Sequence, residues 1–154
     1  MLKAGRSLWI ILNAECWMKS VNYFMLTVEG WTKSENKILE LTFDFSITII
    51  DLYKILISQN EYVISKQLLR SATSIGANVE EANAAQTKKD FAMKMSIASK
   101  EARETKYWLR LLDKSQIIRL DYSSYLDSIE HIINILTKIV KTSQENLSST
   151  QFKI

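Results

Sequence analysis

Apolar residues recur every three or four positions from residue 35 onward, and this spacing is typical of α-helices with one buried face. Polar stretches interrupt the pattern three times. It therefore predicts four helices, near residues 36–58, 61–84, 88–114 and 121–145. Because connections of two to six residues are too short for a crossover, consecutive helices must run antiparallel. We expect an all-α fold, an antiparallel up-down-up-down four-helix bundle.

The same spacing predicts which side chains form the core. The core of the first helix would consist of Ile38, Leu41, Phe45, Thr48, Leu52 and Ile55. The core of the third helix would consist of Phe91, Met95, Ala98, Ala102, Thr105, Leu109 and Leu112. A second apolar face on the first helix would need a subunit neighbour to cover Ile50, Tyr53 and Ile57. A polar residue able to cap a helix start precedes each helix: Ser34, Asn60, Thr87 and Asp121.

Residues 1–34 lack this periodicity, and they contain three of the four tryptophans and the only cysteine, Cys16. We expect them to form an N-terminal extension. It is either loosely attached and translated ahead of a natural start at Met25, or a short amphipathic element that docks on the bundle or on a partner. The bundle would then span residues 35–145, and residues 146–154 would form a C-terminal tail.

Composition narrows the class of protein. The chain has 154 residues, three glycines and no proline, so it lacks the turn residues that a β-sandwich or barrel needs. A single cysteine excludes an intramolecular disulfide framework and a cysteine-based zinc site within one chain. No stretch without charges reaches the roughly 20 apolar residues of a membrane span. We therefore expect a helical protein of the reducing cytoplasm with no membrane partner.

Positive charge is concentrated in one segment. The net charge is +3, but residues 88–119 hold nine basic and four acidic residues, which gives this segment +5. Cations at helical spacing beside Tyr107 and Trp108 are typical of a surface that binds nucleic-acid phosphates and stacks an aromatic ring on an unpaired base. The alternative is a solvated face that pairs with Glu104 and Asp113. The candidate nucleic-acid-binding residues are Lys88, Lys89, Arg103, Lys106, Arg110 and Lys114.

A second polar group surrounds the middle of the second helix. Small side chains flank Gly76, whose cost of about 1 kcal/mol in a helix interior indicates tight helix packing or, alternatively, a bound ligand. We expect Arg70 and Arg103 to neutralise the neighbouring glutamates, because buried carboxylates persist only when they are paired. The predicted structural network consists of Arg70, Ser71, Asn78, Glu81, Glu101 and Glu104.

The sequence carries no pattern of an enzyme active site. Glu101 and Glu104 lie three residues apart, as carboxylates do in dimetal bundles. Those sites also need Glu-x-x-His motifs, whereas the only histidine, His131, follows Glu130 directly. No glycine-rich phosphate loop, Ser-His-Asp order or zinc-ligand spacing occurs. We expect no catalysis, no cofactor and no metal; the alternative is a metal or ligand at the glutamates, which would co-purify.

Two long motifs resemble a known family. Residues 65–82, SKQLLRSATSIGANVEEA, and residues 99–109, SKEARETKYWL, are similar to the second and third helices of the bundle proteins encoded in 23S rRNA intervening sequences. The resemblance spans about residues 36–142 and implies a homopentamer of small antiparallel bundles with no established catalytic activity. Relatives include the accessory variability protein of diversity-generating retroelements, a basic pentamer to which binding of nucleic acid and a reverse transcriptase is attributed.

Two hypotheses for the function result. The first is a non-enzymatic, oligomeric bundle that binds RNA or DNA through the basic face of the third helix. The second is a protein-interaction scaffold that holds a partner such as a reverse transcriptase. A reverse transcriptase gene beside this one would favour the second hypothesis, and an insertion inside an rRNA gene would favour the first.

Overall fold

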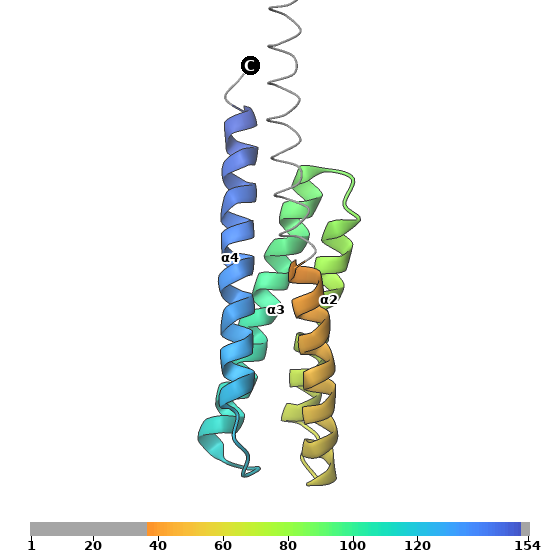
Figure 1. Ribbon diagram of the computed structural model, residues 1–154, viewed down its shortest axis with the longest axis vertical. Coiled ribbons are helices and arrows are strands. Elements are labelled where there is room, and N and C mark those ends of the chain that lie inside the picture. Colours follow the sequence, from red (N-terminus) through yellow and green to blue (C-terminus); the bar gives the residue numbers. More distant parts are fainter. Residues whose placement is uncertain (1–36, 152–154) are drawn as a thin grey trace, which may run out of the picture. The chain divides into compact units, whose positions relative to one another are not determined.

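The structure, a computed structural model, describes residues 37–151, and every regular element in that range is an α-helix (Figure 1). The first described helix occupies residues 37–58 and is followed by α2 (Ile64–Asn83), α3 (Lys88–Ser115) and α4 (Ser123–Gln151). The predicted all-α four-helix bundle is confirmed. However, α4 continues past the predicted end at residue 145 into the segment expected to be a tail. The expectations for residues 1–34, including the cap at Ser34, lie outside the described residues.

Consecutive helices run antiparallel. The chain descends through helix 37–58, returns through α2, descends through α3 and rises again through α4 (Figure 1). Side-chain contacts between α2 and α3 agree with this direction, because residues with higher numbers on α2 pair with residues that have lower numbers on α3. Arg70 bonds to Glu104, whereas Glu81 bonds to Lys94. The short connections allow no other direction.

The core contains one apolar line from each helix, and α3 supplies its predicted line in full. All seven predicted core residues of α3 are buried, from Phe91 at one end to Leu112 at the other. Their spacing of three and four residues keeps them on one side of a helix with 3.6 residues per turn. Tyr122, just ahead of α4, is the largest fully buried side chain of the described residues, and its hydroxyl donates to the carbonyl of Ile118 at 3.3 Å.

The predicted core of helix 37–58 is wrong at two positions. Thr48 and Ile55 are exposed and Leu41 is half-buried. Apolar residues occur on several sides of this helix, so more than one line of three- and four-residue steps fits its sequence. Packing against the other helices selects the line that is buried: Ile38, Thr42, Phe45, Ile49, Leu52 and Leu56.

Of the three caps predicted within the described residues, two accept a backbone N–H at a helix start and one does not. Thr87 caps α3, since its hydroxyl accepts from the backbone N–H of Asp90 at 3.1 Å. Asn60 does not cap α2; it adopts a left-handed conformation with φ 65° in the preceding turn. The buried Glu61 caps that helix instead. Asp121, as predicted, precedes α4 and accepts from the backbone N–H of Ser123 at 2.9 Å.

Gly76 lies where α2 packs against helix 37–58. A Cβ added at this position would lie 3.5 Å from the Ser46 hydroxyl and 3.6 Å from the Thr42 carbonyl oxygen, which are ordinary van der Waals distances. The two helices are therefore close at Gly76, as the small residues predict, but the contact leaves room for one methyl group.

Candidate nucleic-acid interface

The predicted basic residues of α3 differ in how their charges are compensated. Lys106 forms an ion pair with Glu130 of α4, and Lys114 lies 3.3 Å from Asp113. Arg110 is exposed and forms no ion pair with any described residue. Lys88 and Lys89, also exposed, stand at the start of α3. The predicted nucleic-acid-binding residues of α3 thus include both cations that are paired with a carboxylate and cations that are not.

A groove between α3 and α4 gathers a different set of cations. It measures about 320 Å³, and no carboxylate is among the described residues that line it. Three basic side chains line it together with hydroxyl and amide groups, which can donate hydrogen bonds to an anion. We call this the α3–α4 groove; it is lined by Ser96, Ser99, Lys100, Arg103, Thr137, Val140, Lys141 and Gln144.

Neutral oxygens hold Arg103 across the α3–α4 groove. Its guanidinium donates to the Ser99 hydroxyl at 2.6 Å and the Ser99 carbonyl at 3.1 Å, and it reaches α4 at the Thr137 hydroxyl at 3.3 Å. Because none of these partners is charged, they position the guanidinium without cancelling its charge. A guanidinium carries five N–H donors, so it has donors left for a phosphate.

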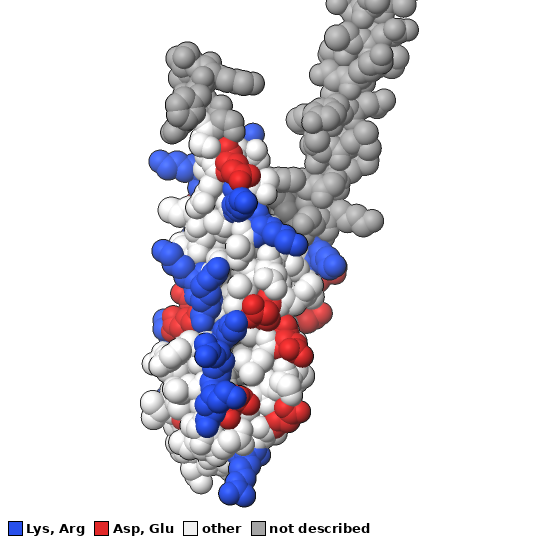
Figure 2. Space-filling view, turned by 90° about the vertical axis from the view of Figure 1, so that its left-hand side faces the viewer, with Lys and Arg blue, Asp and Glu red and all other residues white. Residues whose placement is uncertain are grey.

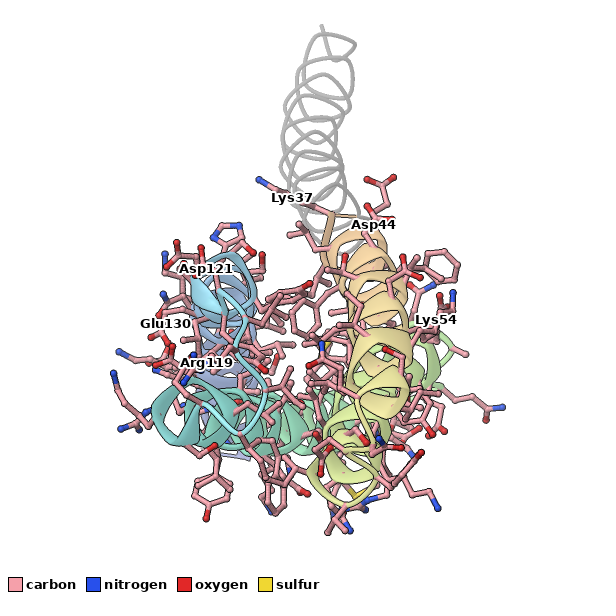
Figure 3. The ribbon with its side chains drawn as sticks, turned by 90° about the horizontal axis from the view of Figure 1, so that it is seen from below. Lys37, Asp44, Lys54, Arg119, Asp121 and Glu130 are labelled. Carbon is pink, nitrogen blue, oxygen red and sulfur yellow. The ribbon has the colours of Figure 1, made fainter. Side chains whose placement is uncertain are left out.

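Basic side chains form a band on the α4 side of the molecule, beside acidic and uncharged ones (Figure 2). Figure 2 views the molecule from the α4 side and shows Lys and Arg side chains following one another along this face, with acidic side chains mostly to either side. Figure 3 shows Glu130, the partner of Lys106, on α4, and Lys54 on the far side of the bundle, on helix 37–58. The exposed Lys138 adds a further cation on α4, three residues before Lys141.

Sequence reasoning missed the α4 side of this surface. It selected Arg103 but not Lys141, because it considered the cations of α3 alone, and it also left out Lys100, three residues before Arg103 on that helix. The signal was available in the spacing, since Lys138 and Lys141 are one turn apart on a helix expected to run antiparallel to α3.

The predicted polar network is only partly connected. Arg70 donates to Glu104 at 2.9 Å, and Glu104 also accepts from the indole of Trp108 at 3.3 Å. The buried Thr105 hydroxyl donates to Ser71 at 3.0 Å and so joins α3 to α2. These contacts fix the register of the two helices.

The remaining network residues have other partners. Glu81 pairs with Lys94, and this hydrogen bond raises the pKa of the lysine. Asn78 donates to the carbonyl of Ser74 on its own helix at 2.8 Å. One carboxylate oxygen of Glu101 is buried without a hydrogen-bond partner. Arg103 therefore does not neutralise the glutamates as expected, because it is turned toward α4.

The described residues contain no group of three or more potential metal ligands. Among the described helices, none combines the length and apolar character that crossing a membrane requires.

A comparison with known families agrees with the resemblance of residues 65–82 and 99–109 described above. The model of the 23S rRNA-intervening sequence protein family matches residues 34–138. The chain belongs to this family. Lys100 and Arg103 lie within the matched residues, whereas Lys141 lies beyond them. No curated protein matches the chain.

One solved structure supports the assignment to the 23S rRNA-intervening sequence proteins. It is a protein of unknown function from the S23 ribosomal protein family of Bacteroides thetaiotaomicron. The two chains are 44% identical and superpose with a TM-score of 0.67 over 70% of this chain and 98% of the other. The chain is therefore similar to this protein in its three-dimensional fold as well as in its sequence.

Proposed function

We propose that this protein is a non-enzymatic, cytoplasmic bundle that binds RNA or DNA through the α3–α4 groove and the adjoining outer face of α3. The observation that carries the proposal is the groove itself, where Lys100, Arg103 and Lys141 meet with no carboxylate among the described lining residues. Phosphates supply most of the affinity of nucleic acids for proteins, and they bind where cations are uncompensated.

The composition of the groove supports phosphate as its ligand. Arg103 is already held in place by Ser99 and Thr137, so binding would not have to order a free guanidinium. Lys100 and Lys141 are exposed, form no ion pair with a described residue, and approach from two different helices. Lys106 can add to this surface, because a partly exposed pair such as its bond to Glu130 is worth only about 0–1 kcal/mol.

Salt dependence tests the proposal. If three phosphates are engaged, affinity for labelled RNA and DNA oligonucleotides should fall about 20- to 40-fold between 50 and 200 mM salt. Fluorescence anisotropy of the full chain measures this slope. Absence of binding at about 50 mM salt, or an affinity that does not change with salt, would refute nucleic-acid binding.

We further propose that the protein self-associates, with the homopentamer that the family resemblance implies as the expected assembly. Phe43 and Ile47 lie one turn apart on helix 37–58 and are 62% and 47% exposed. An exposed apolar pair of this size favours contact with another apolar surface. Light scattering should then give about five times 17.8 kDa for the full chain. Phe43→Ser should reduce this mass, and Lys54→Glu should leave it unchanged.

A second candidate function is a protein-interaction scaffold, favoured by a separate patch at the end of the bundle. Val63 and Ile117 are 76% and 59% exposed there and line a hollow of about 470 Å³ with Tyr62. A partner such as a reverse transcriptase could cover these side chains. The double variant Val63→Ser, Ile117→Ser should abolish co-purification with that enzyme without weakening RNA binding; retention of the complex would refute the second function.

A further inference from the structure

The outer face of α3 presents an aromatic ring within its line of cations. Arg103, Tyr107, Arg110 and Lys114 follow one another at steps of four, three and four residues, which places them on one face of the helix. Tyr107 is 56% exposed and its hydroxyl has no hydrogen-bond partner among the described residues. A tyrosine flanked by cations one turn away on both sides resembles the surfaces that hold single strands, where cations follow the backbone and aromatic rings stack on bases.

The ring of Tyr107 is also held in place. It contacts Trp108 edge to face, with centroids 5.0 Å apart and planes at 70°. Trp108 is itself tied by its indole N–H to Glu104 at 3.3 Å, and Glu104 is held by Arg70 of α2. An edge-to-face contact covers at most one face of the tyrosine ring. With 56% of Tyr107 exposed, part of the ring remains accessible to a ligand.

We propose that Tyr107 makes this surface selective for single-stranded over double-stranded nucleic acid by stacking on an unpaired base. The inference rests on the proposed function, since it assigns the class of nucleic acid to the same site. In a duplex each base is stacked and paired, so an exposed ring finds no base face, whereas in a single strand each base offers one. The cations of the α3–α4 groove bind the backbone of either form.

The test compares one oligonucleotide as a single strand and as a duplex with its complement, in RNA and in DNA, for the full chain. Tyr107→Ala should lower affinity for the single strand about 5- to 100-fold and leave that for the duplex within about twofold. Tyr107→Phe keeps the ring and should retain the single-strand affinity within about threefold. Tyr62→Ala removes a similarly exposed tyrosine, 52% accessible, from the end of the bundle and serves as control.

The outcomes separate the inference from the proposed function. Equal losses for single strand and duplex in Tyr107→Ala, or no loss for either, would overturn selection by Tyr107 while nucleic-acid binding stands. Failure of the unmodified protein to bind any of the four oligonucleotides at about 50 mM salt would overturn both. Circular dichroism of each variant establishes that the helices are intact, which the exposure of Tyr107 leads us to expect.

Discussion

Glu61 caps the start of α2, a role that sequence patterns assign to shorter side chains such as Asn, Asp, Ser and Thr. Its carboxylate accepts from the backbone N–H groups of Val63, Ile64 and Ser65 at 3.0, 2.8 and 2.6 Å. Burial raises the pKa of Glu61, but the hydrogen bonds from Ile64 and Ser65, with the others, outweigh burial and hold it below its ordinary value. A negative charge at a helix N-terminus also interacts favourably with the helix dipole.

Glu61→Gln should therefore destabilise the protein by about 1–2 kcal/mol at neutral pH. Because the folded pKa is lowered, the stabilisation is fully present above the unfolded pKa and is lost as pH falls through the folded pKa. The deficit of the variant should thus shrink in acid, below about pH 4. Urea unfolding followed by circular dichroism measures both values, with the exposed Glu40→Gln as control. An equal deficit at pH 7 and at pH 3 would contradict this assignment.

The caps show how far single residues can be predicted. Thr87 was predictable because a threonine before a charged helix start accepts from the third backbone N–H, a local interaction. Glu61 was not, since its longer side chain reaches three N–H groups only after Asn60 turns the chain with a positive φ. The turn geometry decides which of the two neighbours caps the helix.

At the scale of elements, α2 and helix 37–58 meet at Gly76 with space to spare for one methyl group. Gly76→Ala should stabilise the protein by about 0.5–1 kcal/mol, because alanine restricts the unfolded chain and its Cβ meets Ser46 and Thr42 at ordinary distances. Gly76→Leu should destabilise it by about 1–3 kcal/mol, since the larger side chain forces the helices apart. Thermal melting distinguishes these outcomes; a destabilised alanine variant would show that the contact is tighter than described.

The helices differ in how well the sequence predicts their faces. On α3 charged residues occupy most positions away from the core, and the predicted apolar line is buried in full, although Met93 and Tyr107 are exposed. On helix 37–58 Phe43, Ile47 and Ile55 are apolar yet exposed, so the sequence alone does not select the buried line. The positions of the neighbouring helices determine which apolar line of helix 37–58 is buried.

At the scale of the whole molecule, the candidate site depends on which helices are neighbours. The cations of α3 are predictable from spacing on one helix, whereas the α3–α4 groove exists only because an antiparallel partner brings Lys141 to the level of Lys100 and Arg103. The same packing brings Glu130 to Lys106 and so weakens the lower part of the predicted line. The cations without an acidic partner are therefore found from the ion pairs between helices, and not from the number of charges on one helix.

The location of binding is tested most directly by reversing charges in the groove. The double variant Lys100→Glu, Lys141→Glu should lower RNA affinity at least about 10-fold at 50 mM salt and reduce the slope of log affinity against log salt by about 1–2. The matched control, Lys54→Glu with Lys37→Glu, makes the same change in net charge on helix 37–58 and should alter affinity less than about threefold. Equal losses in the two double variants would contradict a binding site between α3 and α4.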